Sequence, residues 1–305
     1  MSTESVTRKK LPWSARVAFA LSLAVLILGV STVVRWIGPA VALQYDWKPG
    51  DVTRDRMTMS MAFGTTPAIS EQEFEMKLEM TSVTRVLSVD SQGNATLELS
   101  MEDVRLLESN LPPGGGDPTQ KLSQTHTLVV APDGRILESS NPLLGPEAFG
   151  DQGFGTTPLL PDEPVAPGDT WTIDYEQGIG IGEGGFDLHA DNELIRYDEV
   201  NGVETVVIHS DLSGPMDFTI RPSEIPSDLL PEGTDLQTVG NVGDIHYTGE
   251  LSMSADSWVD PLTGEVLRSD AVGESSVSFG FSDLEIGLPR FGLNMEMEME
   301  TLRLP

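Results

Sequence analysis

Apolar and polar residues alternate along much of the chain, as they do in half-buried β-strands. The clearest runs are residues 57–61, 74–80 and 295–300, where every second residue is methionine, phenylalanine or leucine. Successive side chains of a strand point to opposite faces, so each run has one apolar and one polar face. Strands with one wet face are typical of antiparallel sheets. The pattern therefore predicts a mainly β protein with antiparallel sheet.

Five shorter runs also have the residue types of strands. They cover residues 96–99, 127–130, 171–175, 203–209 and 275–281. Glycine-containing turn sequences separate the strands, at residues 91–94, 132–134, 201–202 and 260–264. After residue 36, no run has a clear apolar stripe at helical spacing. Short helices at 142–149 and 223–230 are the only helical elements that the sequence still allows in this part of the chain.

The chain after residue 42 contains two related halves. Pro-Gly-Asp sequences at 49–51 and 167–169 open them, each beside a tryptophan. Gly134 and Gly264 each begin a G-x-(I/V)-L-x-S sequence, at an offset of 264 − 134 = 130 residues. We predict a first β repeat over 43–140, a Gly/Pro-rich connector over 141–165 and a second β repeat over 166–305.

The N-terminal region predicts a membrane segment. Residues 17–34 contain no charged residue and follow a basic leader that contains Arg8, Lys9, Lys10 and Arg16. A helix of this length rises about 27 Å, close to the thickness of the hydrocarbon core. The basic leader orients the N-terminus toward the cytoplasm and the body outside it. We predict a cytoplasmic leader over 1–16 and a single-pass signal-anchor over 17–36. The alternative is a signal peptide cleaved after Ala42, which would release a secreted body.

Charge and cysteine content exclude several classes of function. The chain has 18 Lys and Arg against 48 Asp and Glu, a net charge of −30. Such a surface repels phosphate backbones, so no nucleic-acid partner is expected. The chain has no cysteine, which excludes disulfides, thiolate chemistry and acylation at a lipobox.

No sequence motif indicates catalysis. The four histidines, His126, His189, His209 and His246, are too scattered to give a close pair of metal ligands. The chain has no G-x-S-x-G motif. The glycine-rich run at 178–185 lacks the Lys-Ser/Thr of a phosphate-binding loop. We therefore expect a protein that is not an enzyme and needs no cofactor or metal.

The methionine-rich strands are the main candidate for binding. Methionine is flexible and polarizable, and it lines adaptable surfaces for varied apolar ligands. If the first and last strands lie side by side, their inward side chains form one apolar wall. The candidate residues are Met57, Met59, Met61, Phe74, Met76, Met80, Met295, Met297 and Met299. Ordinary sheet core is the alternative role of these residues, and Cu(I) binding by the Met-x-Met runs is a third.

Residues 160–171 carry a family resemblance. Their sequence motif, LP-x-x-PV-x-PGD-x-W, resembles that of a broad group of uncharacterised bacterial envelope proteins. Proteins of this group have an N-terminal anchor or lipobox. The alternating strands are similar to the half-barrel sheets of lipoprotein-carrier proteins of the LolA, LppX and LprG types. That similarity implies a half-barrel-like sheet whose concave apolar face holds acyl chains. The missing cysteine departs from the lipobox of the LppX and LprG types.

Together these features predict a non-catalytic, membrane-tethered extracytoplasmic protein that binds an apolar ligand such as a lipid. The alternative is a structural or accessory subunit that contacts another protein of the cell envelope. A hydrolase is the third possibility.

Overall fold

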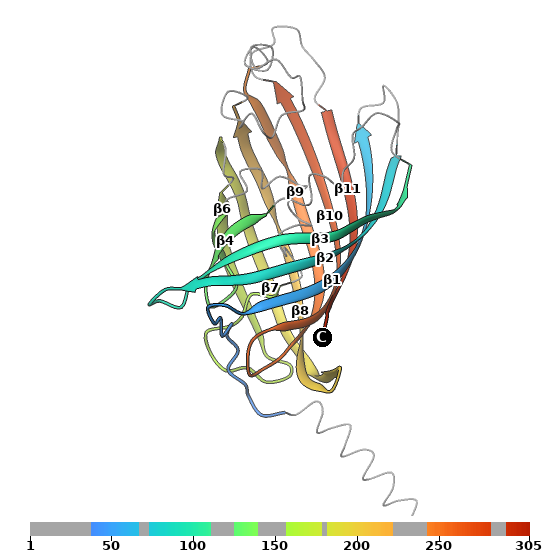
Figure 1. The fold of residues 1–305 in the computed structure, drawn as a ribbon. Helices are drawn as coiled ribbons and strands as arrows, with labels where there is room; N and C mark the ends of the chain where they lie inside the picture. The colour runs from blue at the N-terminus through green and yellow to red at the C-terminus, as the bar shows by residue number, and fades with distance from the viewer. Residues whose placement is uncertain are drawn as a thin grey trace, which may run out of the picture.

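Eleven strands form the regular structure of the chain in the computed structural model (Figure 1). The structure describes residues 38–66, 73–110, 125–139, 157–178, 182–221, 243–281 and 291–305. The strands are β1 (Val52–Thr66), β2 (Glu73–Val89), β3 (Ala95–Ser109), β4 (His126–Val130), β5 (Ile136–Ser139), β6 (Thr170–Gly178), β7 (Glu183–Val200), β8 (Val203–Ile220), β9 (Ile245–Val259), β10 (Val266–Phe281) and β11 (Phe291–Arg303).

All eleven strands belong to one antiparallel sheet. Their order is β5-β4-β3-β2-β1-β11-β10-β9-β8-β7-β6. The chain thus runs as two meanders, β1–β5 and β6–β11, which join where β1 pairs with β11. The predicted mainly β, antiparallel fold is confirmed. Each of the eight predicted strand runs lies within one of these strands.

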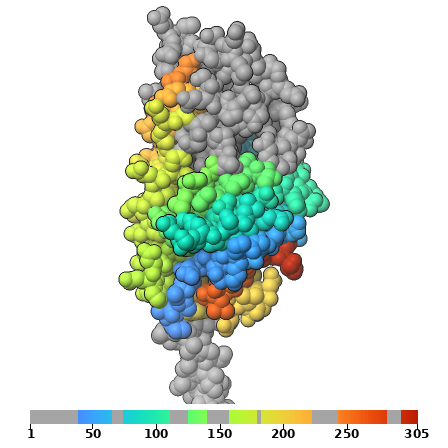
Figure 2. Space-filling model, turned by 60° about the vertical axis from the view of Figure 1, so that its left-hand side comes forward, coloured from blue at the N-terminus to red at the C-terminus, as the bar shows by residue number. Residues whose placement is uncertain are grey.

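The sheet curls further than the predicted half-barrel, into a nearly closed, barrel-like shape. In Figure 1 the strands β1–β3 cross in front of β7–β10. The ladder between β2 and β3 has three register shifts, the first between Lys77 and Leu78. Such bulges bend a sheet and increase its twist, which brings its two ends together. The edges are β5 and β6, and Figure 2 shows the band of the first meander meeting the second along one side.

Two hydrophobic cores fill the molecule. The main core lies inside the curled sheet and takes buried residues from both meanders. A second core closes one end, where residues 41–47 and 157–165 cross the sheet. These two segments, which we call the end cap, are joined by a β-bridge in which Val41 N donates to Val165 O over 2.8 Å. The buried residues of this second core are Leu43, Tyr45, Leu160, Val165, Leu194, Val206, Ile208 and Val259.

Two glycine turns hold the end cap. Leu160 N donates to Asp133 O over 2.8 Å, in the turn between β4 and β5. Asp46 N donates to Thr263 O over 2.9 Å, in the turn between β9 and β10. Gly134 and Gly264 have φ angles of 95° and 74° in these turns, as the predicted turn sequences require.

The two Pro-Gly-Asp sequences have the same hydrogen bonding. Gly50 N donates to Val86 O over 2.8 Å, and Gly168 N donates to Leu194 O over 2.7 Å. Strands β1–β5 fall within the predicted first half and β6–β11 within the second. The origin of the halves by duplication stays a prediction.

Several predictions concern residues outside the described ranges. They are the membrane segment at 17–36, most of the connector, and the short helices at 142–149 and 223–230. In the ranges that are described, no helix has the length and apolar character needed to cross a membrane.

Candidate functional site

The predicted methionine wall is present in the sheet. In the ladder between β1 and β11, Met59 pairs with Met299 and Met61 with Met297. On the other side of β1, Met61 also pairs with Met76. The first and last strands therefore lie side by side, as expected, and the nine candidate residues share one face.

Most of this wall is closely packed. Met57, Met59, Met80, Met295, Met297 and Met299 are each at most 5% exposed and belong to the main core. Among the described residues, Met57 is the one member of the nine that lines the interior cavity described next. Of the other eight, Met61 and Met76 are partly buried and, with Met297, line a second hollow of about 980 Å³. The ligand-binding role of the wall, like the Cu(I) alternative, stays a prediction.

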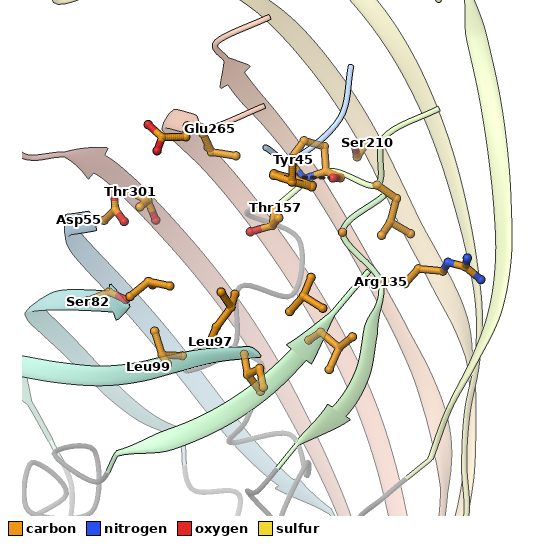
Figure 3. A pocket seen from close by; sticks show the side chains of 18 of the residues that line it. Tyr45, Asp55, Ser82, Leu97, Leu99, Arg135, Thr157, Ser210, Glu265 and Thr301 are labelled. Atoms are coloured by element: carbon orange, nitrogen blue, oxygen red, sulfur yellow. Dashed lines mark hydrogen bonds between the residues drawn. The ribbon is translucent and has the colours of Figure 1, made fainter. Parts of the chain in front are cut away.

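A cavity of about 200 Å³ lies between the main core and the end cap (Figure 3). Both edges of the sheet reach it, with Ile136 from β5 and Tyr175 and Gln177 from β6. The cavity therefore lies beside the seam where no backbone ladder closes the sheet. Its apolar wall includes Met57, Leu97, Leu99, Leu128, Val130, Ile136, Leu159, Ala190 and Leu212.

A charged cluster borders the cavity at the joint between β1 and β11. Arg303 Nε donates to Asp55 Oδ1 over 2.6 Å, and its Nη1 donates to Glu265 Oε2 over 3.1 Å. Its Nη2 donates to Val266 O over 3.1 Å. Burial raises the pKa of Asp55, and the neighbouring Arg303 opposes that shift without cancelling it. The cluster fixes the ends of β1, β10 and β11 to one another.

A second polar group lies across the cavity. Ser210 Oγ donates to Asn192 Oδ1 over 2.7 Å, which anchors an amide that is 3% exposed. The hydroxyl of Tyr45 donates to Pro158 O over 2.8 Å, so it ties the two segments of the end cap together. Burial, with a smaller contribution from Asp133, raises the pKa of Tyr45, and burial alone raises that of Tyr175. Both phenols are neutral at physiological pH.

Two buried polar atoms at the cavity have no hydrogen-bond partner among the residues that the structure describes. They are Trp47 Nε1 and Thr301 Oγ1, and both residues line the cavity. The ring of Trp47 stacks on Tyr45 with a centroid distance of 5.2 Å. Buried polar groups in proteins are normally paired, so these two atoms are exceptions to that rule.

The histidines do not assemble a site. His189 Nδ1 lies 2.5 Å from Asp174 Oδ1, and hydrogen bonding to Asp174, with the charge of Asp191, raises the pKa of His189. His209 is held in a similar way between two aspartates. Within the described part of the chain, no group of three His, Asp or Glu residues has the geometry to hold a metal ion.

The sequence analysis missed the polar residues of the cavity. Their signal is a break in the methionine alternation, which occurs at neighbouring levels of three adjacent strands. Inward positions change from Met57 to Asp55 in β1 and from Met299 to Thr301 in β11. In β2 the change is from Met80 to Ser82. A polar residue that takes over an inward position of an apolar run indicates a polar interior at that level.

No protein-family model matches the chain, and no curated protein has a similar sequence. Several solved structures match the chain at low similarity. The hypothetical lipoprotein YmcC from Escherichia coli has 12% sequence identity and a TM-score of 0.24, and the match covers 81% of this chain and 84% of that chain. DynF, from the dynemicin biosynthesis pathway of Micromonospora chersina, has 9% identity and a TM-score of 0.22, covering 86% and 84%. A DUF1329 family protein from Desulfovibrio piger has 8% identity and a TM-score of 0.15, covering 82% and 85%. At these scores the function has to be argued from the site itself.

Proposed function

We propose that the protein is a non-catalytic binding protein of the cell envelope that holds a small apolar ligand in the cavity beside the β5–β6 seam. The observation that carries this proposal is the cavity itself, whose wall is formed by nine apolar residues from both meanders and the end cap. Small-molecule sites are concave, mostly apolar and largely preformed. This cavity has those properties.

The volume of the cavity limits the size of the ligand that it can hold. A volume of about 200 Å³ is somewhat larger than an apolar cavity that binds benzene, and smaller than most drug-sized pockets. It suits a compact molecule better than a whole acyl chain. Burial of six carbon atoms at about 0.8 kcal/mol each gives about 5 kcal/mol, equivalent to a dissociation constant of about 0.2 mM. A longer ligand would need the methionine wall to repack, which flexible thioether side chains permit.

The position of the cavity supports a role at the membrane surface. The chain enters the sheet through the end cap, and the hydroxyl of Tyr197 donates to Pro39 O over 2.5 Å at this end. An anchor at residues 17–36 would therefore hold the end cap, and the cavity behind it, toward the bilayer. We infer that the ligand exchanges between this cavity and the outer leaflet of the membrane.

Extraction of bound compounds tests the proposal. The full chain is purified from its own membranes, and organic extracts are analysed by mass spectrometry. Leu99→Trp fills the cavity, whereas Val272→Trp places the same side chain on the outer face, where Val272 is 54% exposed. We expect a near-stoichiometric small apolar compound with the wild type and Val272→Trp and its loss with Leu99→Trp. Equal recovery from all three proteins would place the compound outside this cavity. Recovery from none of them would contradict the proposal and favour the accessory-subunit alternative.

A further inference from the structure

We propose that the free edge of β6 binds an extended, basic segment of a partner protein, which adds to the sheet as a further strand. This inference concerns an interaction surface and does not depend on the ligand proposed for the cavity. Three observations carry it: the unpaired backbone of β6, the exposure of its inward side chains, and the charge of its outward side chains.

The hydrogen bonding of β6 to β7 fixes which of its backbone groups are free. Leu194 N donates to Asp169 O over 3.1 Å, just before β6 begins. Asp169 therefore directs its carbonyl toward β7, and in an antiparallel ladder every second residue after it does the same. The ladder runs to Gly178 without a register shift, so this alternation holds along the whole strand. The residues that direct N–H and C=O groups to the open edge are Thr170, Thr172, Asp174, Glu176 and Gly178.

No strand pairs with this edge. β6 is the last strand of the sheet, and among the described residues the backbone of Thr172, Asp174 and Glu176 makes no hydrogen bond on that side. The end cap contacts the beginning of β6, where Trp171 Nε1 donates to Leu159 O over 2.9 Å. Within the described ranges, the edge is therefore open from Thr172 onward.

The inward side chains show that solvent reaches this edge. Ile173 and Tyr175 point inward and pair with Ala190 and Leu188 of β7. The two β7 residues are at most 3% exposed, whereas Ile173 and Tyr175 are partly exposed, because their strand has a neighbour on one side only. An added strand would bury both side chains further, and this burial favours its binding.

β6 lacks several features that protect sheet edges from unwanted pairing. Edge strands are commonly short, interrupted by bulges, or supplied with proline and lysine. β6 has nine residues, its register with β7 has no shift, and it contains neither proline nor lysine. β5, the other edge, has four residues and a register shift in its ladder with β4. Extended peptides bind to long, regular edges by adding a strand.

The outward side chains of β6 favour a basic partner. Asp174 and Glu176 point outward, and the side chain of Asp174 is 81% exposed beside His189. Glu176 lies directly opposite Asp187 of β7, and like charges in this position destabilise a sheet. Lysine or arginine side chains of an added strand would lie opposite Asp174 and Glu176 and offset this repulsion.

A second copy of the chain fits this edge less well. Pairing of two β6 strands would bring Asp174 and Glu176 of both copies to one joint, between molecules that each carry a net charge of −30. The partner segment that we infer alternates basic and apolar residues. Its basic side chains lie on the outward face, and its apolar side chains lie on the inward face next to Ile173 and Tyr175.

A matched pair of peptides tests the proposal. The probe is the peptide Lys-Val-Lys-Val-Lys-Val-Lys with fluorescein at its N-terminus, and the control carries an added N-methyl group on each lysine backbone nitrogen. Both have the same charge, but in an antiparallel pairing like that of β6 with β7 the lysine N–H groups face β6. Binding to the full chain in nanodiscs of zwitterionic lipid is measured by fluorescence anisotropy at about 0.15 M salt. We expect the probe to bind about ten-fold more tightly than the control.

Two substitutions at Thr172 locate the binding. Thr172→Pro removes an N–H group from the open edge and spares the ladder with β7, because that group faces away from it. Thr172→Val keeps the group. We expect Thr172→Pro to weaken the probe about ten-fold and Thr172→Val to leave its affinity unchanged. In the wild type, the probe should also slow hydrogen exchange at the amides of Thr172, Asp174 and Glu176.

Three results would overturn the proposal. Equal binding of both peptides without protection of these amides would show that charge alone attracts them. Failure of the probe to bind would show that the edge accepts no such strand. Self-association of the free protein that Thr172→Pro abolishes would assign the edge to a second copy of the chain. Extraction of the cavity ligand tests the proposed function separately, because it measures a compound and not a strand.

Discussion

Gly264 and Gly168 both have positive φ angles, of 74° and 92°, but their surroundings differ. A Cβ at Gly264 would lie 2.2 Å from the backbone oxygen of Gln44 in the end cap. A Cβ at Gly168 would meet nothing within 4 Å. Both positions need the backbone freedom of glycine, but only Gly264 also needs its missing side chain. Comparing substitutions at these two glycines therefore separates the cost of backbone strain from the cost of a clash with the end cap.

We predict that Gly264→Ala destabilises the protein much more than Gly168→Ala. Gly168→Ala should cost about 1–2 kcal/mol for the left-handed conformation alone. Gly264→Ala should cost about 3 kcal/mol or more, because residues 44–46 have to shift. Urea unfolding of both variants measures the difference. Equal losses would show that this turn does not hold the end cap tightly.

Individual residues differ in how far the sequence predicts them. The turn glycines are predictable because the neighbouring Asp and Asn residues identify each turn and only glycine tolerates its φ angle. The cavity residues are less visible. Thr301 and Asp55 carry a signal only when the register of β1 against β11 is known, because that register puts their polar side chains at neighbouring levels of adjacent strands. The alternation in the sequence shows which face of the sheet a side chain is on. It does not show which residues of the neighbouring strands lie beside it.

The joint between β1 and β11 connects the two meanders through the first and last strands of the chain. Asp55 and Arg303 connect these strands through a hydrogen bond of 2.6 Å, with side chains 14% and 19% exposed. Breaking a buried pair by removing one partner is strongly destabilising, because the other charge stays buried. Surface pairs such as that of Arg54 and Glu102, each about half exposed, contribute little.

We predict that Arg303→Met costs about 3–5 kcal/mol at pH 7 and less at pH 4. Burial raises the pKa of Asp55 even beside Arg303, and loss of Arg303 raises it further. A carboxyl with a raised folded-state pKa destabilises the fold fully above that pKa, and the penalty shrinks as the pH falls from there to the pKa of the unfolded state. Denaturant unfolding at both pH values measures the difference.

Two controls accompany that measurement. Arg54→Met, on the same strand as Asp55, should change the stability by about 0.5 kcal/mol or less at both pH values. Asp55→Asn combined with Arg303→Met should recover part of the loss at pH 7. A penalty for Arg303→Met that is independent of pH would mean that lost packing, rather than the unpaired buried charge of Asp55, causes it.

At the scale of elements, the sequence predicts the strands better than their assembly. Period-2 alternation identifies β1, β2 and β11, since each has one apolar face. The near closure of the sheet depends on bulges such as that between Lys77 and Leu78, where the sequence shows no special residue. The curvature of the sheet, and with it the cavity at the β5–β6 seam, could therefore not be predicted from the pattern.

The whole molecule carries a net charge of −30, and much of it faces outward. Glu296, Glu298 and Glu300 alternate with the buried methionines of β11 and are exposed. Many of the ion pairs in the described ranges join partly exposed side chains, which contribute little stability. Self-repulsion of a highly charged fold opposes its compact state. Salt should therefore stabilise this protein more than it stabilises a neutral one.

We predict that the melting temperature rises as NaCl increases from about 0.05 M to about 1 M, because the screening length falls from above 10 Å to about 3 Å. The expected rise is about 2–4 °C for each kcal/mol of repulsion that is screened. The same series at pH 4.5, where many carboxylates are protonated, is the control and should give a smaller rise. An equal rise at both pH values would assign the effect to salt acting on apolar surface instead.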